Sequence, residues 1–145
     1  MFVENILHQK GSKVLTARAE MKAMDAAREL IEKNIGLLLV TAPDGKIAGI
    51  FSERDIVRGL AERDGDISEA SVGDLMTKDV ITCRPGDSLQ KITSVMTAKR
   101  IRHLPVLNDG DVVGLISIGD VLKFRLEESL LDEEAMRDYI AGRSY

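Results

Sequence analysis

Apolar and polar positions follow one another along this chain in an order that is written twice. Short apolar runs bounded by polar residues predict strands. Three such runs occur in each copy: 14–16, 37–41 and 47–51 in the first, then 80–82, 103–107 and 112–116 in the second. After the first run of each copy, apolar residues recur every three or four positions, which predicts an amphipathic helix. These residues are Met21, Met24, Ala27, Leu30 and Ile31 in the first copy and Leu89, Ile92, Val95 and Met96 in the second, where Asp87-Ser88 offers an N-cap.

The last two strands of each copy are joined by a turn and followed by another helix. An Asp-Gly pair lies between the apolar runs in both "PDGK" (43–46) and "NDGD" (108–111), which predicts two hairpins. Beyond the hairpins, "GIFSERDIVR" (49–58) returns as "GLISIGDVLK" (114–123), each with a serine and an aspartate three residues later. We expect a helix to start after that serine. The sequence therefore predicts a β-α-β-β-α unit repeated in tandem, in the mixed α/β (α+β) class.

The segments outside the two copies set the expected domain limits. A polar linker covers 64–79, and its apolar anchor "VGDLM" (72–76) resembles the N-terminal "VENIL" (3–7). After Lys123 the repeat gives way to an acidic segment with spaced leucines, which predicts a helix. We expect the first repeat with its lead-in over 1–70, the second repeat over 71–125 and an acidic helical tail over 126–145.

Composition narrows the class of protein. Hydrophobic residues make up 44% of the 145 residues but aromatic residues only 3%, so the expected core is aliphatic. A formal net charge of −4 with few aromatic residues argues against a nucleic-acid binder, which needs a basic face and stacking side chains. The single cysteine, Cys83, cannot form an internal disulfide, and no apolar run nears the roughly 20 residues that span a bilayer. We expect a soluble cytoplasmic protein without nucleic-acid or membrane partners.

The sequence carries no pattern typical of catalysis. His8, His103 and Cys83 lack the spacing of metal ligands, and the sequence has neither a glycine-rich phosphate loop nor the nucleophile elbow of hydrolases. The repeated serine and aspartate have no histidine base nearby along the chain. We therefore expect no enzyme activity, no catalytic residue and no metal site.

The repeated Ser-x-x-Asp motif allows two interpretations. In a capping box, the serine and the aspartate bind free N–H groups at the helix start and stabilise it by about 1 kcal/mol. In a ligand site, the same turn presents N–H groups and a hydroxyl to a phosphate, while the aspartate accepts hydrogen bonds from ribose hydroxyls. The preceding Gly49 or Gly114 allows close approach, either by a ligand or by a neighbouring segment. The spacing alone does not choose between them.

The duplicated whole resembles the tandem repeats of the cystathionine-β-synthase (CBS) domain family. The resemblance is carried by "GIFSERD" and "GLISIGD", by "RHLPV" (102–106) and by "VITCRPGDSL" (80–89), and it spans about residues 3–125. It implies two copies packed about a pseudo-two-fold axis, with two clefts that bind adenosine-containing ligands. AMP is the first expected ligand and NAD(H) or ATP the next, with ADP and S-adenosylmethionine in the same class.

The resemblance also assigns site residues. Asp55 and Asp120 would hold ribose hydroxyls, and Ser52 and Ser117 would support the ribose or the first phosphate. In the family, each cleft takes its aspartate from one copy and its strand residues from the other. The strand residues expected beside Asp55 are Thr82, Arg102, His103, Leu104 and Pro105, and those expected beside Asp120 are Thr16, Gly36, Leu37 and Leu38.

The two expected clefts differ in charge. "NIGLLLV" (34–40) lacks the basic pair of "RIRHLPV" (100–106), so the strand side of the Asp120 cleft is less polar. We assign Arg102 and His103 to a phosphate. Lys99 and Arg100 either join that cluster or are cations at a helix C-terminus, where they suit the helix dipole.

These features together predict a non-catalytic regulatory module that senses adenylate energy charge or a redox cofactor. The resemblance implies a homodimer formed through helical faces, and the module would act on a regulated protein that the sequence does not identify. The candidate residues for the dimer surface are Leu60, Ile56, Leu122 and Leu126. The alternative is a structural or interaction protein whose clefts are empty and whose faces mediate assembly.

Overall fold

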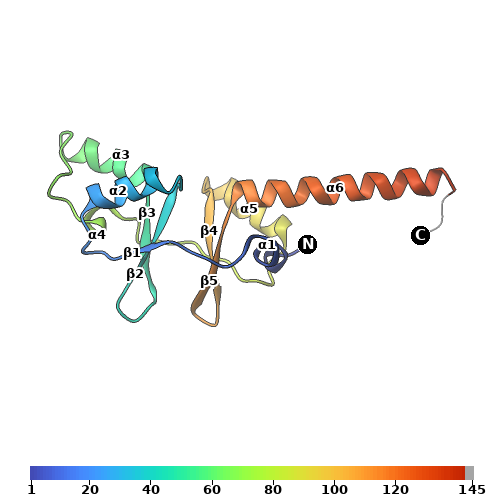
Figure 1. The fold of residues 1–145 in the computed structure, drawn as a ribbon, viewed down its shortest axis with the longest axis horizontal. Coiled ribbons are helices and arrows are strands. Elements are labelled where there is room, and N and C mark those ends of the chain that lie inside the picture. The colour runs from blue at the N-terminus through green and yellow to red at the C-terminus, as the bar shows by residue number, and fades with distance from the viewer. Residues whose placement is uncertain (143–145) are drawn as a thin grey trace. The chain divides into compact units, whose positions relative to one another are not determined.

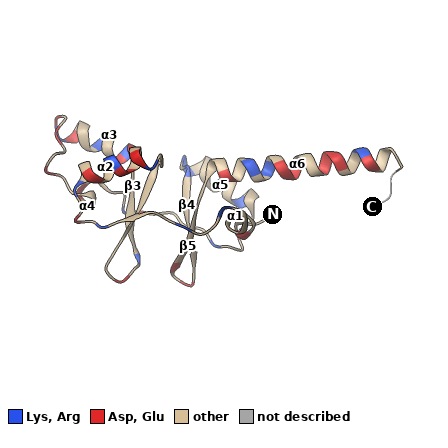
Figure 2. Cartoon of the chain, in the orientation of Figure 1, with Lys and Arg blue, Asp and Glu red and all other residues tan. Residues whose placement is uncertain are grey.

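The computed structural model describes residues 1–142 and confirms a mixed fold of two repeats with a C-terminal helix (Figure 1). The first repeat consists of β1 (Thr16–Ala17), α2 (Ala23–Glu32), β2 (Leu37–Thr41), β3 (Ile47–Ser52) and α3 (Glu53–Glu62). The second consists of α5 (Leu89–Lys99), β4 (His103–Asn108), β5 (Asp111–Ser117) and α6 (Ile118–Ile140). Two short helices, α1 (Val3–Lys10) and α4 (Val72–Leu75), precede the repeats. Charged residues gather on the helices, whereas the strands are mostly neutral (Figure 2).

The chain forms two compact units, which we describe one at a time. The first unit contains Lys13–Thr82, and therefore the first repeat, together with Leu107–Val113. Within the described residues, the second unit contains Met1–Ser12, Cys83–Val106 and 114–142, and therefore most of the second repeat.

The first unit is built on a three-stranded sheet in the order β1-β2-β3. β1 pairs parallel with β2, and β2 pairs antiparallel with β3 through the predicted Asp44-Gly45 turn, where Gly45 has a φ of 84°. Leu38, Val40 and Phe51 place apolar side chains in the core. The small residues Ala23 and Ala26 of α2, with Leu30, pack against that core. An aliphatic sheet face covered by an alanine-rich helix stripe explains how the chain builds a core with so few aromatic residues.

The helix predicted after the first strand is present, but its buried face differs from the predicted pattern. Met24 and Ile31 are 36% and 81% exposed, whereas Ala23 and Ala26 are fully buried. Of the predicted residues, Leu30 is buried and Met21 packs against the core, while alanines complete the buried face and let the helix approach the sheet closely.

The second repeat pairs β4 with β5 in a two-stranded sheet. The hairpin turn at Asp109-Gly110 has positive φ at both residues, 51° and 86°, as tight hairpins require. The strand predicted at 80–82 is wrong: the ladder here is a single parallel bridge between Cys83 and Val106. Val80 N donates instead to Lys78 O at 3.0 Å, in a local turn, and the chain bonds to β4 at Cys83, whose N donates to Pro105 O at 2.9 Å.

Each short lead-in helix packs beside a repeat that it does not directly precede. In the second unit, Val3 N donates to Asp87 O at 2.9 Å, which ties α1 to the turn before α5. In the first unit, Val72 N donates to Met21 O at 2.8 Å, which ties α4 to the turn before α2. The resemblance between 3–7 and 72–76 therefore reflects one structural role used twice.

The C-terminal helix is long and continuous. α6 extends through Ile140, so the segment predicted as a helical tail is helical from 126 to 140, and residues 143–145 lie outside the described part. Val121 and Phe124 are its buried apolar residues, while the apolar side chains further along are exposed. None of the helices described is long and apolar enough to cross a membrane.

Candidate functional site

Both repeated motifs form capping boxes where a strand runs directly into a helix. Ser52 N donates to Asp55 Oδ2 at 2.8 Å before α3, and Ser117 N donates to Asp120 Oδ2 at 2.9 Å before α6. Both serines have extended backbone, with φ of −135° and −109°. The predicted helix starts are confirmed. The capping interpretation of the motif therefore holds at both places. The remaining question is whether either aspartate also has a free acceptor for a ligand.

Asp55 has no acceptor capacity left for a ligand. Its Oδ2 accepts hydrogen bonds from Ser52 N and, at 3.2 Å, from Ser52 Oγ. Its Oδ1 accepts from Arg58 Nη2 at 2.6 Å and from Thr77 Oγ1 at 2.7 Å. These four bonds match the roughly four lone-pair sites of a carboxylate, and only 1% of the residue is exposed. Asp55 thus fastens the start of α3 to the segment that follows α4.

The Arg58 side chain completes this network. Its Nη2 also donates to Leu75 O at 2.9 Å, at the end of α4. The arginine therefore neutralises the buried carboxylate and satisfies a carbonyl of the short helix at once.

Asp120 is more accessible. Its side chain is 25% exposed, and Lys10 Nζ donates to its Oδ2 at 2.7 Å. Lys10 Nζ also donates to Leu115 O at 2.8 Å, so α1 is held to the end of β5. Within residues 1–142, the hydrogen bonds to this carboxylate go to Oδ2, which leaves Oδ1 as an acceptor for a ligand hydroxyl.

The protonation state of Asp120 is set by opposing effects. Burial acts to raise the pKa of the carboxyl, but the hydrogen bonds from Lys10 and Ser117 and the charge of Lys10 together lower it below its ordinary value. Asp120 is therefore an anion at neutral pH.

The two glycines of the motif serve packing. A Cβ at Gly49 would lie 2.7 Å from Thr77 O and 2.8 Å from Met76 Sδ. A Cβ at Gly114 would lie 2.5 Å from a methyl carbon of Leu7. Each glycine thus makes room for a lead-in segment, α4 and the residues after it in one case and α1 in the other. Of the two explanations left open by the sequence, close approach by a neighbouring segment is the one observed.

The strand residues predicted for the clefts occupy both units. Thr16, Gly36, Leu37 and Leu38 lie in the first unit, and Arg102, His103, Leu104 and Pro105 in the second. Leu38 is a core residue with no exposed area, and Leu104 is equally buried, so neither residue presents accessible surface to a ligand. Thr82 and Arg102 are exposed. Thr82 lies in the same unit as Asp55, whereas the other predicted strand residues lie in the opposite unit from their aspartate, so those combinations stay predictions.

A cavity of about 180 Å³ opens beside Asp120, entirely within the second unit. Its lining residues are Ile6, Gln9, Lys10, Asp120, Lys123 and Phe124. The sequence argument assigned only the aspartate to a site. Lys123 could have been found, because it is the base that ends the repeated stretch and corresponds to Arg58. Lys10 could not, because its role depends on the packing of α1 against the second repeat.

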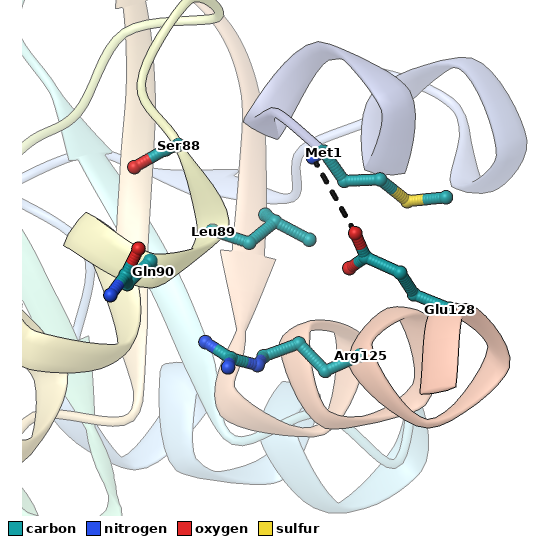
Figure 3. Close-up of a pocket in the computed structure, with 6 residues that line it drawn as sticks. All are labelled: Met1, Ser88, Leu89, Gln90, Arg125 and Glu128. Carbon is teal, nitrogen blue, oxygen red and sulfur yellow. Dashed lines mark ion pairs between the residues drawn. The ribbon is translucent and has the colours of Figure 1, made fainter. Parts of the chain in front are cut away.

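A second cavity of the same unit, of about 200 Å³, lies between α5 and α6. Glu128 faces the Met1 nitrogen, 3.9 Å away (Figure 3), and Arg125 Nη1 donates to Thr93 Oγ1 at 3.5 Å. No residue predicted for a site lines it. Across residues 1–142, no group of His, Cys, Asp and Glu is arranged to hold a metal ion.

Comparison with known proteins decides the family. The family model of the CBS domain matches residues 4–62 and 72–127, the two repeats described above. The chain belongs to the CBS-domain family. The resemblance seen in the sequence is therefore confirmed, and the second CBS match contains Asp120 as the first contains Asp55.

Other CBS-domain proteins resemble this chain over most of its length. The CBS domain-containing protein CBSX3, mitochondrial, of Arabidopsis thaliana is 30% identical over 97% of this chain and 72% of its own. The crystal structure of the CBS-domain containing protein ATU1752 from Agrobacterium tumefaciens is 40% identical, with a TM-score of 0.82 over 86% of this chain and 99% of that one.

One CBS-domain pair of known structure has ligands bound. The pair of protein MJ0100, in complex with 5′-methylthioadenosine and S-adenosyl-L-methionine, is 27% identical to this chain. The TM-score is 0.76, over 88% of this chain and 98% of that one. Adenosine-containing ligands are therefore bound by a CBS pair of the same fold.

Proposed function

We propose that this chain is a non-catalytic regulatory CBS pair that binds adenosine-containing nucleotides, with Asp120 as its principal ribose-binding residue. The single observation that supports the proposal is the accessible carboxylate of Asp120 beside a cavity, with Oδ1 unused by the chain's own donors. AMP is the first ligand to test, and NAD(H) and ATP are next.

The chemistry of the site suits a ribose. Two neighbouring hydroxyls can donate to one carboxylate, and hydrogen bonds to a charged acceptor are each worth about 1.5–3 kcal/mol. Ser117 Oγ is engaged with Asp120 N at 3.1 Å, so its main role is to hold the aspartate in place. Binding would then act as a regulatory signal by favouring one conformation of the pair over others.

Isothermal titration calorimetry with AMP tests the proposal. Asp120→Ala should lower the affinity at least about tenfold, the equivalent of 1.4 kcal/mol. The matched control is Asp74→Ala, because Ser71 and Asp74 form another capping box at α4, and Asp74 is exposed and does not line the cavity. Asp74→Ala should leave the affinity unchanged.

Two results would overturn the proposal. If Asp120→Ala binds AMP as the wild type does, Asp120 is a capping residue and nothing more. If none of AMP, ATP, NADH and S-adenosylmethionine binds below about 1 mM, an interaction protein with empty clefts becomes the better account.

The proposed module is a homodimer that associates through α6. Leu122 and Leu126 are 60% and 62% exposed on that helix, which makes them the stronger candidates. Leu60 is 36% exposed, whereas Ile56 packs against the core of the first unit. Sedimentation should give a dimer at tens of micromolar, and a strict monomer would remove this part of the proposal.

A further inference from the structure

Residues 129–140 of α6, here named the distal segment, project from the packed part of the second unit. Val121 and Phe124 bury the first turns of the helix, whereas none of the residues from 129 to 140 is buried in the described part of the chain. Figure 1 shows this segment continuing past α1 and α5, the helices that contact α6. The second CBS match ends at residue 127, so the distal segment also lies outside the repeats that define the family.

Large apolar side chains are exposed along the distal segment. Five of them are between 55% and 77% exposed, namely Leu130, Leu131, Met136, Tyr139 and Ile140. Leu131 follows the buried Phe124 by about two helical turns, and Tyr139 lies about two turns further along. The apolar stripe that packs the start of α6 into its unit therefore continues onto the exposed part. Apolar surface gathered in this way is typical of a site where another protein binds.

The same part of the helix is strongly acidic. From residue 127 to residue 138 the chain has six carboxylates and one guanidinium, that of Arg137. The guanidinium is engaged with Glu133, because Arg137 Nη2 donates to Glu133 Oε1 at 2.7 Å. The whole chain has a formal net charge of −4, so its negative charge is concentrated here and the other residues are together close to neutral. A partner that covers the apolar side chains also meets these carboxylates and must be basic.

The helix gains little stability in this segment from the chain itself. Glu128 and Asp132 are four residues apart, and like charges at that spacing destabilise a helix. An isolated helix shorter than about 12–15 residues is marginal in water. A basic partner would supply both the apolar contacts and the counterions that the segment lacks.

We propose that the distal segment binds a basic amphipathic helix of a partner protein. Aliphatic side chains of that helix would pack on the apolar stripe, and its lysines or arginines would pair with the flanking carboxylates. A second copy of the segment fits less well, because it brings the same excess of negative charge. Nucleic acids and anionic lipid surfaces are repelled for the same reason.

This surface is separate from the two already described. The proposed dimer contact uses Leu122 and Leu126, which precede the distal segment, and the cavity beside Asp120 is lined from α6 by residues no later than Phe124. The proposal therefore goes beyond nucleotide binding and can fail or succeed independently of it.

Fluorescence anisotropy with designed peptides tests the chemistry of the partner. The probe is a labelled lysine-leucine peptide whose leucines are spaced three and four residues apart, so that it forms a basic amphipathic helix. The full chain should bind it at least about tenfold more tightly than a scrambled peptide of the same composition or a glutamate-leucine peptide of the same pattern. If the probe binds no better than its scrambled version, the proposal is overturned.

Exposed substitutions assign the binding to the distal segment. Leu131→Ser with Tyr139→Ser should weaken binding of the probe at least about tenfold. The matched control is Ile31→Ser with Val57→Ser, which removes apolar side chains that are 81% and 66% exposed in the first unit and should leave the affinity unchanged.

A second pair of variants tests the charge. Asp132→Asn with Glu134→Gln should weaken binding of the probe, whereas Glu62→Gln with Glu69→Gln removes an equal charge from exposed positions of the first unit and should not. Equal losses in the two pairs would show a general attraction to an acidic protein and overturn the proposal.

Backbone amide NMR and sedimentation separate the remaining outcomes. The probe should shift the signals of residues 129–140 and leave those of residues 117–120 in place, and AMP should bind all four variants as it binds the wild type. If Leu131→Ser with Tyr139→Ser abolishes a dimer and leaves binding of the probe unchanged, the surface belongs to a second copy and the proposal is wrong.

Discussion

Asp55 and Asp120 occupy the same position in two copies of one motif, yet they differ in how many of their carboxylate acceptor sites the chain itself uses. Asp55 receives four hydrogen bonds, from Ser52, Arg58 and Thr77, and is buried. Asp120 is partly exposed, and its charge partner is Lys10 of α1. In the first repeat the base that ends the motif closes on the aspartate, whereas in the second it stays in a cavity. A repeated motif can therefore be fully hydrogen-bonded and buried in one copy and partly exposed beside a cavity in the other.

The largest expected difference between the copies is in stability. Asp55→Ala removes the buried acceptor of Ser52 N and Thr77 Oγ1, and each part-buried polar group left without a partner costs about 1–3 kcal/mol. Arg58 adds little to this cost, because its side chain is 45% exposed and keeps its bond to Leu75 O. Asp120→Ala removes a cap and a partly exposed ion pair, which should cost about 1 kcal/mol. Urea unfolding followed by circular dichroism measures both.

Thr77→Val tests the same network more gently. It removes one hydrogen bond to Asp55 and should cost about 1 kcal/mol. Equal destabilisation by Asp55→Ala and Asp120→Ala would contradict the contrast drawn between the two copies.

The motif glycines should give an intermediate effect. Gly49→Ala would press a methyl group on a backbone oxygen, Thr77 O, whereas Gly114→Ala would meet the flexible end of Leu7. Overpacking costs about 1–3 kcal/mol, and Gly49→Ala should lie at the upper end because backbone yields less than a side chain.

Gly119→Ala is the control for the glycine series. Its Cβ would meet only Ser117 Oγ at 3.6 Å, and the residue lies in the first turn of α6. Thermal melting should show this variant unchanged or slightly stabilised. A loss of stability as large as that of Gly49→Ala would mean that the cost comes from the glycine backbone rather than from the close contact.

The sequence was sufficient for the order of elements, because the hairpins and capping boxes are local. Asp44-Gly45, Ser52 and Ser117 each act through residues within three positions, so their spacing is visible in the chain. The short bridge at Cys83 was not visible, because pairing there depends on where β4 lies. Met24 and Ile31 were predicted on the buried face for a related reason. Periodicity indicates which side of a helix is apolar, but not which part of that side the sheet covers.

The candidate site could likewise be predicted only where it depends on local sequence. The acidic residue of each motif could be predicted from the sequence and the family resemblance. That Asp55 is saturated depends on Thr77, 22 residues away, and that Asp120 is open depends on Lys10, 110 residues away. Such contacts are decided by how the lead-in helices pack, and no local pattern encodes them.

The smallest expected effect concerns the Lys10–Asp120 ion pair and its dependence on pH. The folded-state pKa of Asp120 is lowered, mainly by Lys10 and Ser117 against the opposing effect of burial. The stabilisation is therefore fully present above the unfolded-state pKa, about 3.9, and is lost as the pH falls through the lower folded-state value. Both side chains are partly exposed, so solvent screening limits the ion pair to about 1 kcal/mol or less.

Lys10→Met isolates this contribution. The variant also loses the bond to Leu115 O, but that loss is the same at every pH, so only the pH-dependent part of the difference reports on Asp120. Urea unfolding should give a constant difference in the free energy of unfolding between wild type and Lys10→Met from pH 7 to about pH 5. That difference should narrow below about pH 4, as the carboxyl is protonated in the folded state. Lys123→Met removes the same charge from the same cavity without breaking an ion pair. Its free energy of unfolding at pH 7 should therefore be closer to that of the wild type. If the two variants show the same pH profile, the ion pair contributes nothing of its own, and Lys10 acts on Asp120 only as one of two equivalent charges around an open carboxylate.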